Sequence, residues 1–151
     1  MGLDMYLTAE KYLSEFDPES KDKIEKINTL FGIAGGDDYR VSSIIFDVAY
    51  WRKANAIHGW FVQNIQGGTD DCQKSYVTKE DLTALLIACK EVLSDPKKAE
   101  TLLPPARGFF FGSDCIDDRY FADIKSTITQ IERILNDKAL EGMDLCYRSS
   151  W

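Results

Sequence analysis

The stretch Tyr50–Val62, "YWRKANAIHGWFV", gathers the side chains of this sequence that are best suited to binding a ligand. It contains two tryptophans, an arginine, a lysine, an asparagine and His58, the one histidine of the chain. Aromatic rings stack on planar ligands, and cationic and amide side chains hydrogen-bond to anionic or polar groups. The stretch is therefore interpreted either as a ligand site or as a helix with an unusually polar core face.

Apolar residues recur through this stretch with helical spacing, which predicts a helix over residues 51–65. At about 100° per residue, Asn55 and His58 fall on the same side as Trp51 and the apolar residues. A buried amide or imidazole without a partner costs about 1–3 kcal/mol, so both side chains need partners. One interpretation is a core asparagine and histidine bonded to the backbone. The other is a pocket wall on which Trp51 stacks while Asn55 and His58 donate or accept hydrogen bonds.

Arg52 and Lys53 fall in the first turn of this predicted helix. Cations there oppose the helix dipole, so helix stability alone does not favour them. Together with free backbone N–H groups they form a candidate phosphate site. The alternative is a pair of solvated surface charges.

Further aromatic residues indicate contact surfaces. Trp60 falls on the polar face of the predicted helix, where a large aromatic side chain is typical of an interface, and Trp151 ends the chain. Arg107 precedes three consecutive phenylalanines, among which Phe109 and Phe111 are candidates for stacking on a base. Three core residues are the simpler interpretation of the phenylalanine run.

Charge and cysteine usage exclude several classes of protein. The net charge of −7 argues against a binder of genomic nucleic acid or of an anionic membrane. Four scattered cysteines and one histidine give no zinc or disulfide spacing, so we expect free thiols, no metal and no cofactor. The common catalytic motifs do not occur, and no catalytic residue is expected. The N-terminal residues lack the pattern of a signal peptide, which favours a soluble cytosolic domain.

The remaining sequence predicts a single α+β domain over residues 1–151, with a mostly antiparallel sheet packed with about four helices. Strands are expected near 2–8, 39–50 and 142–151, with a turn at 35–38. The segment 104–113 contains two prolines and two glycines and leads into a buried strand or an apolar loop. Helices are expected after Asp17-Pro18, after Thr78, which with Asp81 resembles a capping box, and over 117–136, capped by Asp114 or Asp117.

Six segments together resemble a widespread family of small proteins encoded by tailed bacteriophages. They are "MGLDMYL", "YWRKANAIHGWFV", "DDC", "LLPPARGFFFGS", "IDDRYFADI" and "YRSSW", which run nearly end to end. This family looks like the phage sponge proteins, which sequester nucleotide immune signals such as cyclic dinucleotides. The resemblance implies a cytoplasmic anti-CBASS protein of the infected bacterial cell, forming a homo-oligomer that binds its ligand without cleaving it.

The residues and the resemblance together give a list of candidates. Two other functions stay open: an enzyme that degrades such a nucleotide with His58 as general acid or base, and an inhibitor that binds a host protein through Trp60 and the acidic surface. Trp60 and Trp151 are the predicted interface residues. The predicted ligand-binding residues are Tyr50, Trp51, Arg52, Lys53, Asn55, His58, Arg107, Phe109 and Phe111.

Overall fold

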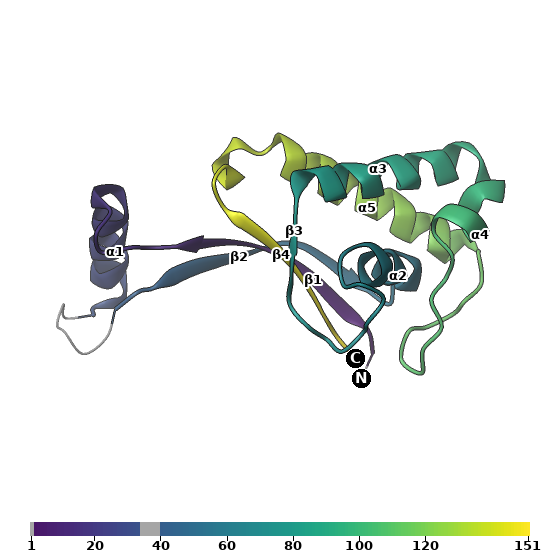
Figure 1. Ribbon diagram of the computed structural model, residues 1–151, viewed down its shortest axis with the longest axis horizontal. Helices are drawn as coiled ribbons and strands as arrows, with labels where there is room; N and C mark the ends of the chain where they lie inside the picture. The colour runs from purple at the N-terminus through teal and green to yellow at the C-terminus, as the bar shows by residue number, and fades with distance from the viewer. Residues whose placement is uncertain (1, 34–39) are drawn as a thin grey trace.

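A computed structural model describes residues 2–33 and 40–151 of the chain. Its sheet is antiparallel, with four strands in the order β2-β1-β4-β3 (Figure 1). The predicted α+β class is confirmed. The strands are β1 (Asp4–Tyr12), β2 (Ser43–Arg52), β3 (Ser75–Val77) and β4 (Asp144–Ser150).

Local capping signals set the starts of three helices. The Asp17 carboxylate accepts hydrogen bonds from the backbone N–H groups of residues 19 and 20, with Pro18 at the first helical position. Thr78 and Asp81 form the predicted capping box, and Asp117 rather than Asp114 caps the last helix. The helices are α1 (Pro18–Phe31), α2 (Asn55–Asn64), α3 (Lys79–Ser94), α4 (Ala99–Leu102) and α5 (Asp118–Asn136), with 3-10 turns at Pro96–Lys98 and Lys138–Leu140.

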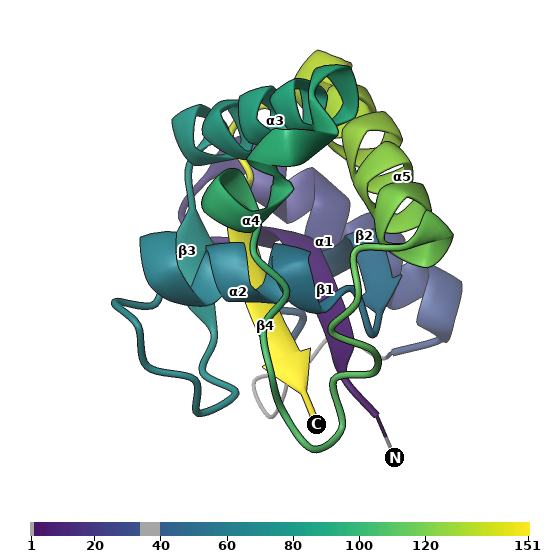
Figure 2. The ribbon, with the colours of Figure 1, turned by 90° about the vertical axis from the view of Figure 1, so that its right-hand side faces the viewer.

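Helices α2, α3 and α5 lie on one side of the sheet, and the core lies between them and the strands (Figures 1 and 2). Met5 and Leu7 of β1, and Leu3 just before it, alternate into this core and are fully buried. The ring of Tyr147 in β4 stacks on Phe61 of α2, with 3.9 Å between ring centroids. We call this side of the sheet the covered face and the opposite side the open face.

Strands β1 and β2 continue past the rest of the sheet and form a projecting arm, residues 11–33 and 40–47. Strand β4 pairs with β1 only from Asp4 to Glu10, whereas β2 follows β1 as far as Tyr12. Helix α1 sits at the far end of this ribbon, away from the other helices (Figure 1). Phe31 of α1 is 72% exposed because this helix has no larger core to pack against.

The predicted start of the second helix is wrong. Trp51 and Arg52 belong to β2, where they pair with Met5 and Asp4, and α2 begins only at Asn55. Lys53 forms the turn between them with a φ of 58°. Arg52 and Lys53 therefore do not occupy the first turn of a helix, which removes the helix N-terminus from the predicted anion site.

Two smaller expectations also change. Trp60 is half-buried, with its ring edge-to-face against Phe61 at 5.4 Å, so it is not an exposed residue of a polar face. The segment 104–113 is an irregular loop in which Phe111 is buried and Phe109 is exposed. The predicted turn at 35–38 lies outside the described residues.

Across residues 2–33 and 40–151, no helix combines the length and the apolar character needed to cross a membrane.

Candidate functional site

The end of strand β2 distributes its side chains between the two faces of the sheet. Trp51 points to the covered face, where it is 3% exposed and its Nε1–H donates to Thr127 Oγ1 at 2.9 Å. Tyr50 and Arg52, on either side of it, point to the open face, because successive residues of a strand alternate. Tyr50 is 46% exposed, and Arg52 is also exposed.

The strand register brings two further side chains to Tyr50 on the open face. Tyr6 of β1 is directly opposite Tyr50 on one side and Arg148 of β4 on the other. The two tyrosine rings are 5.4 Å apart between centroids, and the Arg148 guanidinium carbon lies 4.8 Å from the centre of the Tyr6 ring. The result is a continuous row of two aromatic rings and one cation across three strands.

Asp4 joins this row to Arg52. Its carboxylate accepts a hydrogen bond from the Tyr50 hydroxyl and lies 3.4 Å from Arg52 Nη1. The hydrogen bond to Asp4 raises the pKa of Tyr50, so the phenol stays protonated at neutral pH. Arg52 is held at one end only, since a monodentate contact at this distance leaves most of its guanidinium donors to solvent.

Tyr76 adds a third aromatic ring to the open face. It pairs with Cys146, which lies two residues before Arg148 on the same side of β4. Its side chain is 74% exposed. In the parts of the chain that the structure describes, no helix packs over this face. We call Asp4, Tyr6, Tyr50, Arg52, Tyr76 and Arg148 the open-face cluster.

Asn55 and His58 serve the covered side of the molecule. Asn55 Nδ2 donates to the carbonyl oxygens of Phe111 at 3.2 Å and Ser113 at 2.7 Å, which fixes the loop that follows Arg107. Both Asn55 and His58 are buried. They therefore hold neighbouring segments in place, and a direct role in ligand binding stays a prediction for both.

His58 is 1% exposed and both of its ring nitrogens have partners. Nδ1 lies 2.7 Å from the Tyr147 hydroxyl and Nε2 lies 2.8 Å from Asp70 Oδ2. The other oxygen of Asp70 accepts from Trp151 Nε1 at 3.1 Å. A neutral imidazole with a proton on Nε2 satisfies all of these contacts. The network anchors the C-terminal tryptophan and engages both ring nitrogens of the imidazole inside the protein.

The remaining predicted ligand residues lie in the irregular loop 104–113, at one end of the covered face. Phe111 packs edge-to-face against His58, with 5.0 Å between centroids, and is buried. Phe109 is 95% exposed, and Arg107 forms an ion pair with Asp114 at 3.0 Å. The loop reaches the same end of the sheet as Arg52, because Leu3 N donates to the Phe110 carbonyl.

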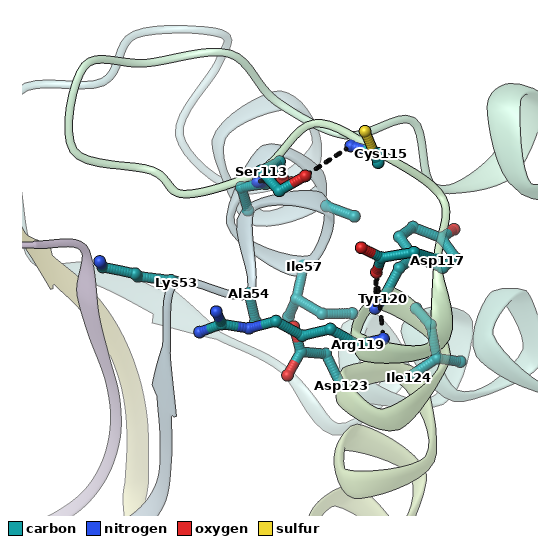
Figure 3. Close-up of a pocket in the computed structure, with 12 residues that line it drawn as sticks. Lys53, Ala54, Ile57, Ser113, Cys115, Asp117, Arg119, Tyr120, Asp123 and Ile124 are labelled. Carbon is teal, nitrogen blue, oxygen red and sulfur yellow. Dashed lines mark hydrogen bonds between the residues drawn. The ribbon is translucent and has the colours of Figure 1, made fainter.

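A small polar pocket opens where Lys53, the start of α2 and the start of α5 meet (Figure 3). Arg119 and the carboxyl groups of Asp117 and Asp123 lie around it, whereas the ammonium group of Lys53 points away from it. Burial raises the pKa of Asp123. The pocket has a volume of about 20 Å³, which is room for about one water molecule. A nucleotide does not fit in a pocket of this volume.

Sequence reasoning missed Asp4, Tyr6, Tyr76 and Arg148 as members of the cluster. Tyr6 and Arg148 lie 142 positions apart in the chain and meet only through the pairing of the first and last strands. The alternation of residues in each strand was the available signal, but it does not reveal which strands are neighbours.

Within residues 2–33 and 40–151, no group of three or more histidine, cysteine, aspartate or glutamate side chains is arranged to hold a metal ion. Compared with known proteins, the chain matches no protein-family model, no curated protein and no solved structure.

Proposed function

We propose that this chain is a bacteriophage counter-defence protein that binds a host nucleotide immune signal and sequesters it without cleaving it. The ligand is of the cyclic dinucleotide class, and binding takes place in the cytoplasm of the infected bacterial cell. The observation that carries the proposal is the row of Tyr50, Tyr6 and Arg148 beside Arg52 on the open face.

The chemistry of the open-face cluster matches that of a nucleotide. Aromatic rings on an exposed sheet stack on bases, at about 1–3 kcal/mol per base. Arginine guanidinium groups pair with phosphate oxygens through charge-assisted hydrogen bonds. Tyr50 and Tyr76 are the exposed rings, and Arg52 and Arg148 are the cations on the same face.

The placement of His58 favours binding over catalysis. A general acid or base must reach the reacting group within hydrogen-bond distance. Both nitrogens of His58 are engaged inside the protein, and the side chain is almost fully buried. This is the reason to prefer sequestration over the degrading enzyme, and the resemblance to phage sponge proteins points the same way.

The proposal is tested by incubating the purified chain with a panel of cyclic dinucleotides, cyclic oligonucleotides and ADP-ribose derivatives. The protein is separated from free nucleotide and heated, and the released material is identified by mass spectrometry. We expect one member of the panel to be retained and released intact. Release of an altered nucleotide would establish an enzyme, and the absence of any retained nucleotide would contradict the proposal.

A further inference from the structure

The arm exposes far more apolar surface than a free two-stranded ribbon can keep in water. Phe16 and Leu30 are 91% and 79% exposed, and Ile45 and Phe46 of β2 are 57% and 48% exposed. A ribbon of two strands is marginally stable without a third strand or a packed helix over its apolar side. Exposed apolar side chains concentrated on one projecting element are typical of an interaction site.

The outer edge of β2 is uncovered along the arm. Nearer the helices, α5 protects this edge, because the Gln130 side chain accepts from Tyr50 N and the Arg133 side chain donates to the Val48 carbonyl. Beyond Val48, over Ser43–Asp47, no strand of the described chain pairs with this edge. The outer edge of β1 is different, since Lys11 Nζ donates to the Gly142 carbonyl at 3.0 Å. An unprotected strand edge is a template for pairing with another strand.

We propose that two copies of this chain pair through the Ser43–Asp47 edges of β2, antiparallel about a two-fold axis at Ile45. Opposite residues of antiparallel strands lie on the same face, so this register sets Ile44 against Phe46 and Ser43 against Asp47. If one strand is shifted by two residues relative to the other, Asp47 or Ser43 lies opposite Ile45 instead. With the two-fold axis at Ile45, apolar residues lie opposite apolar residues and polar residues opposite polar ones, which favours this register.

The base of the arm offers a place for the partner's arm tip. A groove of about 390 Å³ lies there, lined by Phe46, Val48, Ile134, Leu140 and Met143 together with polar neighbours. In the proposed pairing, the two strands run in opposite directions, so the far end of each arm approaches the base of the other. The exposed apolar residues of α1 then have an apolar groove on the partner to approach.

Charge favours a second copy over a strongly charged partner. Helix α1 contains three acidic and three basic residues, Glu19, Asp22 and Glu25 against Lys21, Lys23 and Lys26, and is neutral overall. The whole chain has a net charge of −7. Two copies can therefore meet through neutral helices without bringing their net charges into direct opposition, whereas a nucleic acid or an anionic membrane finds no basic surface on α1.

This inference locates the oligomer that the sequence predicts, and it does not depend on nucleotide binding. Sedimentation equilibrium of the ligand-free full chain at micromolar concentrations should give twice the chain mass of 17.1 kDa. Ile45→Lys places two like charges at the axis and should return the mass of one chain. Tyr76→Lys is the matched control, an exposed aromatic residue on the other edge strand, and should leave the mass doubled.

A cross-linking experiment tests the register even if Ile45→Lys folds poorly. Opposite Cα atoms of antiparallel strands lie about 4.5–5.5 Å apart, within the range of a disulfide. In a chain carrying Cys72→Ser and Cys115→Ser, Ile45→Cys should give a covalent dimer on mild oxidation, whereas Tyr12→Cys on β1 should not. A wild-type monomer, a dimer that survives Ile45→Lys, or cross-linking through Tyr12→Cys but not Ile45→Cys would overturn the proposal.

Discussion

On the covered face of the sheet, Trp51 and His58 direct their polar atoms to Thr127, Tyr147 and Asp70, and both side chains are almost fully buried. On the open face, Tyr50 and Arg52, the immediate neighbours of Trp51, are exposed and share the single carboxylate of Asp4. The same short segment thus supplies buried structural residues to one side of the sheet and exposed aromatic and cationic residues to the other. A short stretch rich in residues suited to ligand binding does not have to form a single site. In a strand, neighbouring side chains point to opposite faces of the sheet.

The largest expected effect concerns Trp51 and Tyr50. Trp51→Ala should lower the free energy of unfolding by about 3–5 kcal/mol, since it removes a buried ring and leaves Thr127 without its donor. Tyr50→Ala, on the open face, should lower it by less than about 1 kcal/mol. Urea titration followed by circular dichroism measures both. Equal losses for the two variants would show that the two faces do not differ as described.

Asn55 tests whether the covered side positions the loop at the end of the sheet. Asn55→Ala leaves the carbonyl oxygens of Phe111 and Ser113 without a donor, and we expect a loss of about 1–3 kcal/mol. Hydrogen exchange should increase across residues 108–114 more than in β4. Asn64→Ala is a suitable control, because Asn64 is exposed and its amide bonds only within its own helix. Similar effects from both variants would remove the special role of Asn55.

Alkaline pH should act on the tyrosines of the covered side. Burial raises the pKa of Tyr120 to about 12, above its ordinary value of 10.0. Between these two values the unfolded chain releases the Tyr120 proton and the folded chain keeps it, so stability falls as pH rises. Burial also raises the pKa of Tyr147 and adds to the same loss.

Tyr120→Phe isolates this contribution. It removes the hydrogen bond to the Leu103 carbonyl and should cost about 1 kcal/mol at neutral pH. Between pH 10.0 and about 12 its stability should fall less steeply than that of the wild type. Melting temperatures recorded across this pH range give the comparison, and parallel pH profiles for the two proteins would contradict the assignment.

Elements with local signals could be predicted from the sequence, and elements set by distant pairing could not. Asp17-Pro18 and the Thr78–Asp81 capping box predict the starts of α1 and α3, because a cap is formed by residues within three positions of one another. The start of α2 carries no such signal: its N-cap is Ala54, which makes no side-chain cap, and the preceding turn uses Lys53 instead of glycine. Helical periodicity therefore extended the prediction back into β2.

The candidate site was predictable only in part for the same reason. Tyr50 and Arg52 stood out by residue type, but the choice of face depended on whether they belong to a helix or to a strand. Tyr6 and Arg148 join them through the register of β1 with β2 and β4, which is a property of the folded sheet. The arm exists because β1 and β2 pair beyond the end of β4. The local sequence pattern of each strand does not show how far its pairing with another strand extends.

The smallest expected effect on stability belongs to Arg52→Ala, which makes this variant the cleanest probe of the open face. Arg40→Ala is its matched control, because Arg40 is an arginine of similar exposure, paired with Glu15 on the arm. Both variants should unfold within about 0.5 kcal/mol of the wild type. A variant that is stable and folded allows any change in binding to be assigned to the lost guanidinium.

Calorimetric titration of wild type, Arg52→Ala and Arg40→Ala with cyclic di-AMP and cyclic GMP–AMP tests the central claim most directly. The wild type and Arg40→Ala should bind one of these nucleotides equally well, and the affinity should fall as salt rises. Arg52→Ala should bind about ten- to a hundredfold more weakly, from the loss of a charge-assisted contact of roughly 1.5–3 kcal/mol. A wild type that binds neither nucleotide, or an Arg52→Ala variant that binds as tightly as the wild type, would contradict the account.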